Sequence, residues 1–276
     1  MTASEANLPA FLIDKRRLKE GEVFAFACHP GVPCFNSCCA DVNIVLTPLD
    51  VLRLARRLGL HTRDFLESYT SNPITKDLKL PMVMLKMKDA EGKPCPFVGA
   101  AGCTVYGDRP WACRMYPLGM AIPPARAGEE PEPLFFVFED DHCQGRLQAG
   151  APQWTAEAWR RDQGVVAQDE FEAGFRELVS HPWFIGGRRQ LDPRRIEMFY
   201  MACYDLDTFR SFIFESSFRD RFELDPDLEN QIARDDEALL RFAFRWLRFA
   251  GTRVLLAIAR TRQAQRYFGL GDRACH

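Results

Sequence analysis

Eight cysteines between residues 28 and 143 constrain this chain more than any other feature of its sequence. Four of them fall within CHPGVPCFNSCC, where two are adjacent, and three more fall within CPFVGAAGCTVYGDRPWAC. Proline and glycine interrupt both stretches, which is typical of turn-forming loops that can aim several side chains at one place. Buried structural cysteines instead scatter through the apolar positions of a core. The thiols therefore form disulfides or bind a metal.

The compartment of the protein distinguishes these two explanations. The N-terminal stretch MTASEANLPAFLIDKRRLKE lacks the apolar segment of a secretory signal, and no apolar run in the chain reaches the length of a membrane span. We therefore expect a cytoplasmic protein, in which thiols stay reduced and structural disulfides are rare. A chain of 276 residues can also bury a sizeable core without cross-links. Thiolate coordination of a metal is the favoured interpretation.

The spacing of the cysteines bears on the identity of the metal. The predicted ligands are Cys28, Cys34, Cys38, Cys39, Cys95, Cys103, Cys113 and Cys143. The chain has no C-x2-C pair of the kind common in zinc sites, whereas iron–sulfur clusters accept varied spacing because their irons lie apart. Adjacent Cys38 and Cys39 point in different directions and suit two metal atoms better than one. Iron–sulfur centres, of the 4Fe-4S type, are favoured, and zinc stays open because it shares the preference for thiolates.

Two arginines lie close to the cysteines in sequence. Arg109 and Arg114 flank Cys113 and are predicted to contact the cofactor, where a guanidinium offsets thiolate charge or donates hydrogen bonds to sulfur. The alternative is an ordinary surface ion pair with an acid such as Asp108 or Glu139. The sequence leaves both interpretations open.

The distribution of cysteines suggests two regions. We expect a cysteine-cluster metal-binding module over residues 1–150 and a helical region over residues 151–276 that packs against it as one globular unit. The expected fold class is mainly α with a few short β-strands (α+β), in which a loop-rich cysteine module packs on helices. Apolar alternation predicts strands within 79–87 and 133–139.

Helix signals are strong at two places. Thr47, Pro48 and Asp50 are the cap, first and third residues of a predicted helix that ends at Gly59. Apolar periodicity from Leu228 to Trp246 predicts one long amphipathic helix ended by Gly251.

The partner classes follow from charge. The net charge of −2 gives no general attraction to nucleic acid or to an anionic membrane. A helix pair over residues 48–70 has the outline of a helix-turn-helix, but only Arg63 is placed to read bases, so we interpret it as a packing pair. We expect a protein or redox partner, no nucleic acid and no membrane.

The ordered motifs resemble a known family. CHPGVPCFNSCC, then IVLTPLDVLRLARRLGL, then CPFV and CTVYGDRPWACRMYP together are similar to the YkgJ-type cysteine-cluster proteins of bacteria and archaea, the CxxCxxCC family. The resemblance covers roughly residues 25–143 and implies a zinc- or iron-chelating domain. The first cysteines of the family are closer together than Cys28 and Cys34, which puts the role of Cys28 in question. A similar cysteine run occurs in flagellin lysine N-methylases, which are iron–sulfur proteins.

These observations predict a cytosolic metal-binding protein that holds one or two thiolate-ligated centres and acts in electron transfer or protein modification. One alternative is a zinc-chelating structural or interaction module. Another, implied by the resemblance alone, is an iron–sulfur-dependent protein lysine N-methylase. The sequence contains no clear Gly-rich nucleotide loop, and its catalytic residues are unknown, so its status as an enzyme stays open.

Overall fold

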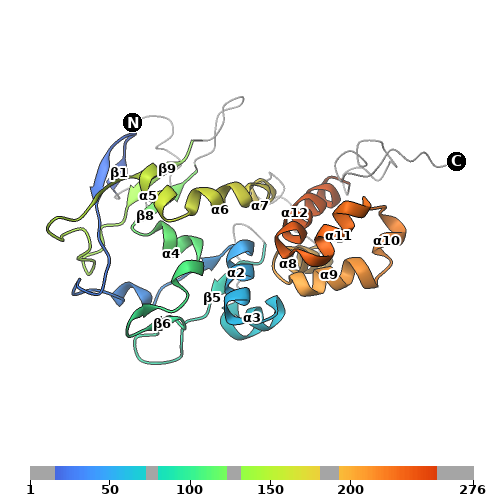
Figure 1. The fold of residues 1–276 in the computed structure, drawn as a ribbon, viewed down its shortest axis with the longest axis horizontal. Helices are drawn as coiled ribbons and strands as arrows, with labels where there is room; N and C mark the ends of the chain where they lie inside the picture. Colours follow the sequence, from blue (N-terminus) through green and yellow to red (C-terminus); the bar gives the residue numbers. More distant parts are fainter. Residues whose placement is uncertain (1–15, 73–79, 123–131, 181–192, 254–276) are drawn as a thin grey trace. The chain divides into compact units, whose positions relative to one another are not determined.

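The computed structural model describes residues 16–72, 80–122, 132–180 and 193–253 (Figure 1). Within these ranges the chain forms helices α2 to α12 and ten strands of two to four residues each. This arrangement confirms the predicted class, mainly α with a few short strands. In the described part of the chain, every helix falls short of the length or apolar character needed to cross a bilayer.

The chain divides into two compact units, each built from two stretches of sequence. The cysteine unit comprises Met1–Ile44 and Met87–Ala167, and the helical unit comprises Val45–Lys86 and Gln168–His276. The boundary near residue 150 that cysteine use suggests stays a prediction.

The helical unit opens with a helix whose ends are specified locally. Helix α2 (Pro48–Leu58) begins with a capping box in which the Thr47 hydroxyl accepts a hydrogen bond from the Asp50 amide and the Asp50 carboxylate accepts one from the Thr47 amide. Gly59 ends the helix in the left-handed conformation at φ 66°, which glycine adopts without strain. The predicted start and end of this helix are confirmed.

A small antiparallel sheet accompanies this helix. Its strands are β3 (Val45–Leu46), β5 (Val83–Leu85) and β4 (Thr70–Ser71), with β5 in the middle. The strand predicted within residues 79–87 is therefore confirmed as the short β5.

The remaining helices of the unit pack around aromatic side chains. They are α3 (Thr62–Tyr69), α7 (Ala173–Val179), α8 (Pro193–Cys203), α9 (Leu206–Glu215), α10 (Phe218–Arg221), α11 (Pro226–Arg234) and α12 (Asp236–Arg253). Phe209 is fully buried, and its ring centroid lies 5.4 Å from that of Trp246 and 6.2 Å from that of Phe242. These contacts join α9 to α12.

The long helix predicted between Leu228 and Gly251 is wrong in two respects: the structure has two helices there, and the second continues past Gly251 to Arg253. α11 ends at Arg234 and α12 begins at Asp236. The Asp235 carboxylate between them accepts hydrogen bonds from the amides of Glu237 and Ala238, at 2.8 and 3.3 Å. This side chain satisfies amides that have no partner inside a new helix, so the chain starts a second helix at that point.

The cysteine unit consists of short strands, long loops and short helices. Strands β1 (Arg16–Leu18), β9 (Leu134–Val137) and β8 (Leu118–Ala121) form one antiparallel sheet with β9 in the middle, which confirms the strand predicted within 133–139. Two further strand pairs join β2 to β10 and β6 to β7. They are β2 (Val23–Ala25), β10 (Gln153–Thr155), β6 (Val98–Gly99) and β7 (Gly102–Cys103).

Four short helical segments and one connecting helix complete the unit. They are η2 (Ser37–Cys39), η3 (Tyr106–Asp108), α4 (Trp111–Met115) and α5 (Ala156–Asp162), and α6 (Val165–Phe171) leads from this unit into the helical one.

An aromatic core holds the cysteine unit together. The ring of Phe26 lies edge-on against Trp159, with centroids 5.4 Å apart, and against Tyr116, with centroids 6.0 Å apart. The indole N–H of Trp159 donates to the Met115 carbonyl at 3.1 Å, so this buried polar group is satisfied. Cys143 belongs to the same cluster of buried residues. The loops that carry cysteines therefore begin on this core.

The helical unit offers a direct test of its aromatic core. Replacing Phe209 with Ala should lower the free energy of unfolding by roughly 3–5 kcal/mol, because a fully buried ring leaves a cavity. Phe214→Ala, at a half-buried position on the same helix, should cost much less. Urea denaturation of both variants measures the difference, and equal costs would contradict the assigned core.

Candidate metal centre

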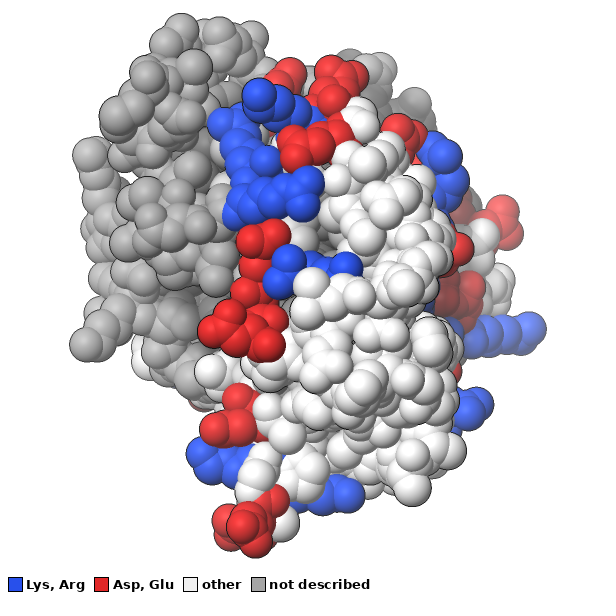
Figure 2. Space-filling model, turned by 90° about the vertical axis from the view of Figure 1, so that its left-hand side faces the viewer, with Lys and Arg blue, Asp and Glu red and all other residues white. Residues whose placement is uncertain are grey.

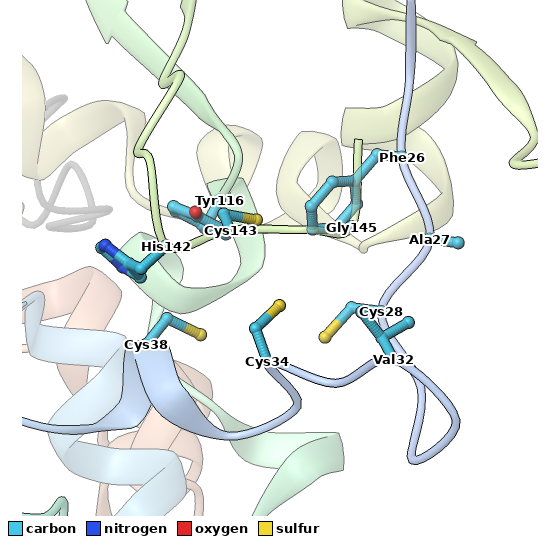
Figure 3. Close-up of a pocket in the computed structure, with 10 residues that line it drawn as sticks. All are labelled: Phe26, Ala27, Cys28, Val32, Cys34, Cys38, Tyr116, His142, Cys143 and Gly145. Carbon is cyan, nitrogen blue, oxygen red and sulfur yellow. The ribbon is translucent and has the colours of Figure 1, made fainter. Parts of the chain in front are cut away.

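Four cysteines line one pocket in the cysteine unit. These residues, called here the first thiol set, are Cys28, Cys34, Cys38 and Cys143. Figure 3 shows the sulfurs of this set around a common space, with the Tyr116 side chain beside Cys143 and the His142 ring turned away from the sulfurs. Cys28 follows β2, Cys38 lies in η2, and Cys143 comes from the loop after β9. Segments distant in sequence therefore bring four thiols to one place.

The other four cysteines form a second thiol set, which comprises Cys39, Cys95, Cys103 and Cys113. The Cys95 amide donates to the Cys39 carbonyl at 2.7 Å. The Cys39 thiol also lies near enough to Cys95 and Cys113 for their charges to raise its pKa, and Cys103 acts on Cys95 in the same way. The hairpin of β6 and β7 pairs Val98 with Cys103 and so holds the segment after Cys95 beside Cys103.

Adjacent Cys38 and Cys39 belong to different sets. Both lie in the single 3-10 turn of η2. The Cys39 thiol hydrogen-bonds to the Cys38 sulfur, which lowers the pKa of Cys38 to about 6 and raises the pKa of Cys39 well above its usual range. The nearby His142 further favours the Cys38 thiolate.

Cys28 and Tyr116 have a different electrostatic environment from Cys38. Desolvation, together with the neighbouring cysteine sulfurs, raises the pKa of Cys28 to about 11, although part of this residue is exposed. Burial also raises the pKa of Tyr116, whose hydroxyl contacts Cys143 and lies 3.3 Å from an Asp140 carboxylate oxygen. In the metal-free chain these groups are therefore neutral at pH 7.

Consecutive turns position the first cysteines. The amides of Val32, Phe35, Ser37 and Cys39 each donate to a carbonyl three residues earlier. Asn36 takes the left-handed conformation at φ 69°, which asparagine tolerates, and its side-chain amide donates to the Gly99 carbonyl at 3.2 Å. This contact ties the turn that carries Cys38 and Cys39 to the hairpin beside Cys95 and Cys103.

Gly145 allows the two ends of the first thiol set to approach each other. The Ala27 amide donates to the Gly145 carbonyl at 3.0 Å. A Cβ atom at Gly145 would lie 2.7 Å from the Ala27 carbonyl oxygen and 2.9 Å from the Phe26 ring. No side chain larger than hydrogen fits there without movement, so this position keeps Cys143 beside Cys28.

Backbone amides donate to one sulfur in each set. The Gln144 amide lies 3.1 Å from Cys34 Sγ, and the Phe97 amide lies 3.5 Å from Cys95 Sγ. Such hydrogen bonds stabilise thiolates and tune a bound metal. Loops around a thiolate-ligated centre commonly provide amide hydrogen bonds of this kind.

The two arginines predicted to contact the cofactor make structural hydrogen bonds. Arg114 donates to the carbonyls of Gly107, Arg109 and Gln163, and so joins the loop before α4 to the end of α5. Arg109 donates to the Tyr106 carbonyl and the Gln163 side chain, and its guanidinium lies 3.9 Å from the centre of the Tyr106 ring. Arg109 also slightly favours the Cys28 thiolate. Contact of either arginine with a cofactor stays a prediction.

Two of the stretches that carry cysteines contain no charged side chain. Neither residues 26–40 nor residues 94–107 contain a single Lys, Arg, Asp or Glu. On the face of the molecule shown in Figure 2, a broad uncharged region lies beside a band of mixed acidic and basic side chains. Within these two stretches the negative charge of the thiolates would be compensated by what they bind and by backbone amides, with further compensation from His142 at Cys38 and Arg109 at Cys28.

The donor chemistry of the two sets fits a thiolate-ligated metal centre. All nine cysteines in the described ranges are free, so the eight candidate thiols are available as ligands. Over the same ranges, no three His, Cys, Asp or Glu side chains already converge closely enough to hold a metal ion. The cysteines therefore fit a thiolate-ligated metal in the type and number of their donor atoms and in lying near one another. All eight predicted ligands remain candidates on this basis.

Sequence reasoning missed two residues at this site. Tyr116 lines the pocket of the first thiol set, and Gly145 determines how closely its two ends approach. The only local signal was their position two or three residues from a cysteine, in CRMY and CQG. Cys203 is fully buried in the helical unit and belongs to neither set.

Comparison with known proteins assigns the segment to one family description. Residues 27–144 match the model of the CxxCxxCC family, described as "Putative zinc- or iron-chelating domain". The matched segment contains all eight candidate cysteines and confirms the resemblance expected from the ordered motifs. No curated protein and no solved structure matches the chain.

The close approach at Gly145 generates one prediction. Gly145→Ala should lower the free energy of unfolding by about 1–3 kcal/mol, because the added methyl group clashes with backbone and a buried ring. Gly107→Ala is the matched control, since a Cβ there meets nothing within 4 Å. Thermal unfolding with metal analysis measures both effects. Equal stability of the two variants would contradict the packing described for the loop.

The hydrogen bond between the adjacent thiols generates another prediction. In the metal-free, reduced protein at pH 7, iodoacetamide should modify Cys38 faster than the more exposed Cys28, because only the thiolate reacts. The Cys38 rate should fall as the pH drops through its pKa of about 6. Cys39→Ala removes the donor and should slow the reaction. Peptide mapping by mass spectrometry gives each rate, and faster labelling of Cys28 would refute the prediction.

Proposed function

Because residues 27–144 match the model of the CxxCxxCC family, we propose that this protein is a metalloprotein whose two thiol sets each hold one thiolate-ligated centre. The first thiol set and the second thiol set each supply four sulfur donors, the usual number for a tetrahedral zinc site or a cubane iron–sulfur cluster. The family description supports the binding of zinc or iron, and the number and type of centres are our proposal.

The position of Cys38 and Cys39 carries the proposal of two centres. Their Cα atoms are neighbours on one turn, yet Cys38 lines the pocket with Cys34 and Cys143, whereas Cys39 neighbours Cys95 and Cys113. A single mononuclear site would need both sulfurs at two corners of one tetrahedron. In the proposal, each sulfur of the pair joins the set whose other members it neighbours.

Iron–sulfur centres of the 4Fe-4S type are the proposed cofactors. The irregular spacing of the cysteines and the amide hydrogen bonds to Cys34 and Cys95 support this choice. When bound, such clusters supply one-electron redox chemistry. The residues of this chain would ligate the cluster, donate hydrogen bonds to sulfur and limit the access of water through the aromatic core of Phe26, Tyr116 and Trp159.

Electron transfer with a protein partner in the cytoplasm is the proposed role. Nine free cysteines in the described ranges are consistent with a reducing compartment. The uncharged stretches around the thiols would leave a partner's docking little affected by salt. Protein lysine methylation stays a prediction from resemblance, and no feature of the described residues adds to it.

Metal and sulfide analysis tests the cofactor. Protein purified without oxygen should contain iron and acid-labile sulfide in equal amounts, at about eight of each per chain, and should absorb visible light. Replacement of the iron by about two zinc ions, with no sulfide, would instead identify a zinc-chelating module. A protein with neither metal would overturn the proposal.

Single substitutions test the division into two centres. Cys38→Ser and Cys39→Ser should each remove about half of the bound metal, because each replaces a ligand of a different centre, and the double variant should lose nearly all of it. Cys203→Ala is the control, since this buried cysteine lies in the helical unit. Loss of all metal from either single variant would indicate one shared centre.

A further inference from the structure

A cluster of buried polar groups lies in the helical unit, apart from the cysteines. Asp50, Gln168 and Glu172 are at most 2% exposed, although two of them are carboxylic acids. Asp50 lies in the first turn of α2, Gln168 lies in α6, and Glu172 caps the start of α7. Carboxylates are rarely buried this deeply, because removal from water disfavours the charged form.

One side-chain amide joins both acids. Nε2 of Gln168 lies 2.8 Å from an oxygen of Asp50 and 3.2 Å from an oxygen of Glu172. Two carboxyl groups that accept hydrogen bonds from the same nitrogen lie within a few ångström of each other. At that separation in a buried site, two negative charges repel strongly.

The same acids hold the first turn of α2. One oxygen of Glu172 accepts the Leu49 amide at 3.0 Å, and one oxygen of Asp50 accepts the Thr47 amide at 3.0 Å. Glu172 therefore supplements the capping box from a segment far along the chain. Among the described residues, no Lys, Arg or His forms an ion pair with Glu172.

We propose that Glu172 and Asp50 form a pH-sensitive switch in the helical unit, in which one proton on Glu172 keeps the α2 cap in contact with the junction of α6 and α7. With the proton in place, only Asp50 of the two acids is charged, and the Thr47 and Leu49 amides and the Gln168 side chain donate to the pair. When Glu172 ionises, the repulsion between the two carboxylates weakens this contact.

The surroundings of Glu172 agree with this assignment. Burial is the main cause that raises its pKa to about 7, and the Asp50 charge is the next, while hydrogen bonds from the Leu49 amide, Thr47 and Gln168 act in the opposite direction. Cys203 and Tyr204, at the end of α8, also lie near Glu172. Both are buried and have pKa values well above neutral, so they carry no charge that would affect its ionisation. Arg53 reaches the Gln168 oxygen, at 3.3 Å.

The direction of the pH effect follows from linkage. The ordinary pKa of this carboxyl group is 4.5, so between about pH 4.5 and 7 the folded protein holds a proton that the unfolded chain has released. The stabilisation of the folded protein by this proton is complete below this pH window, falls as the pH rises through it, and is lost above it. The pH range near neutrality is where the switch operates.

Unfolding measured against pH tests the switch. From pH 5 to 8 the unfolding constant of the wild type should rise by roughly a hundredfold more than that of Glu172→Gln, whose amide cannot ionise. Glu170→Gln, at an exposed position near the end of α6, should follow the wild type. An identical pH dependence in Glu172→Gln and the wild type would overturn the proposal.

A second measurement applies even if Glu172→Gln fails to fold. In the wild-type protein labelled with 13C at glutamate side-chain carboxyls, one resonance should titrate near pH 7. Titration of every glutamate near its ordinary value would overturn the proposal. Because no member of the cluster belongs to a thiol set, Glu172→Gln should bind as much metal as the wild type at the same pH, so this outcome is separate from that of the proposed function.

Discussion

The packing of Phe26 against Trp159, with no room beside the Phe26 ring for a side chain at Gly145, is the constraint on which the cysteine unit depends. Phe26 lies two residues before Cys28, and Gly145 lies two residues after Cys143, so one contact holds both ends of the first thiol set. The strand pair of β2 and β10 enters this core, and the Trp154 indole donates to the Phe26 carbonyl at 3.2 Å. Loops that carry thiols have little regular structure of their own, and a rigid base is what lets them act as one site.

Much of the local structure could be predicted because its causes are local. The start of α2 depends on Thr47, Pro48 and Asp50, which contact one another within four residues. The break between α11 and α12 was missed because apolar periodicity continues across it, whereas the decisive interaction is the single Asp235 cap. Apolar periodicity shows which face of a helix is buried, but it does not show where one helix ends and the next begins.

The candidate site shows the same limit in another form. Clustered cysteines in turn-rich sequence predicted the donors, and the adjacency of Cys38 and Cys39 suggested two centres. The sequence did not show how the six remaining cysteines divide between the set of Cys38 and the set of Cys39. That division depends on tertiary contacts, such as the Asn36 hydrogen bond to Gly99 and the hydrogen bond between Ala27 and Gly145. The roles of Tyr116 and of the buried pair of Asp50 and Glu172 depend on such contacts too, because the two acids are far apart in sequence.

The interleaving of the two units has a consequence for synthesis on the ribosome. Residues 45–86, which carry α2 and α3, belong to the helical unit, although the family segment 27–144 encloses them. Helix α3 packs against α9, and α2 against α12, so the apolar faces of the first pair emerge from the ribosome more than a hundred residues before their partners. A nascent chain of this protein therefore presents reactive thiols and unpaired apolar helices at the same time. Its folding calls for late, long-range closure, the slow step for topologies of this kind.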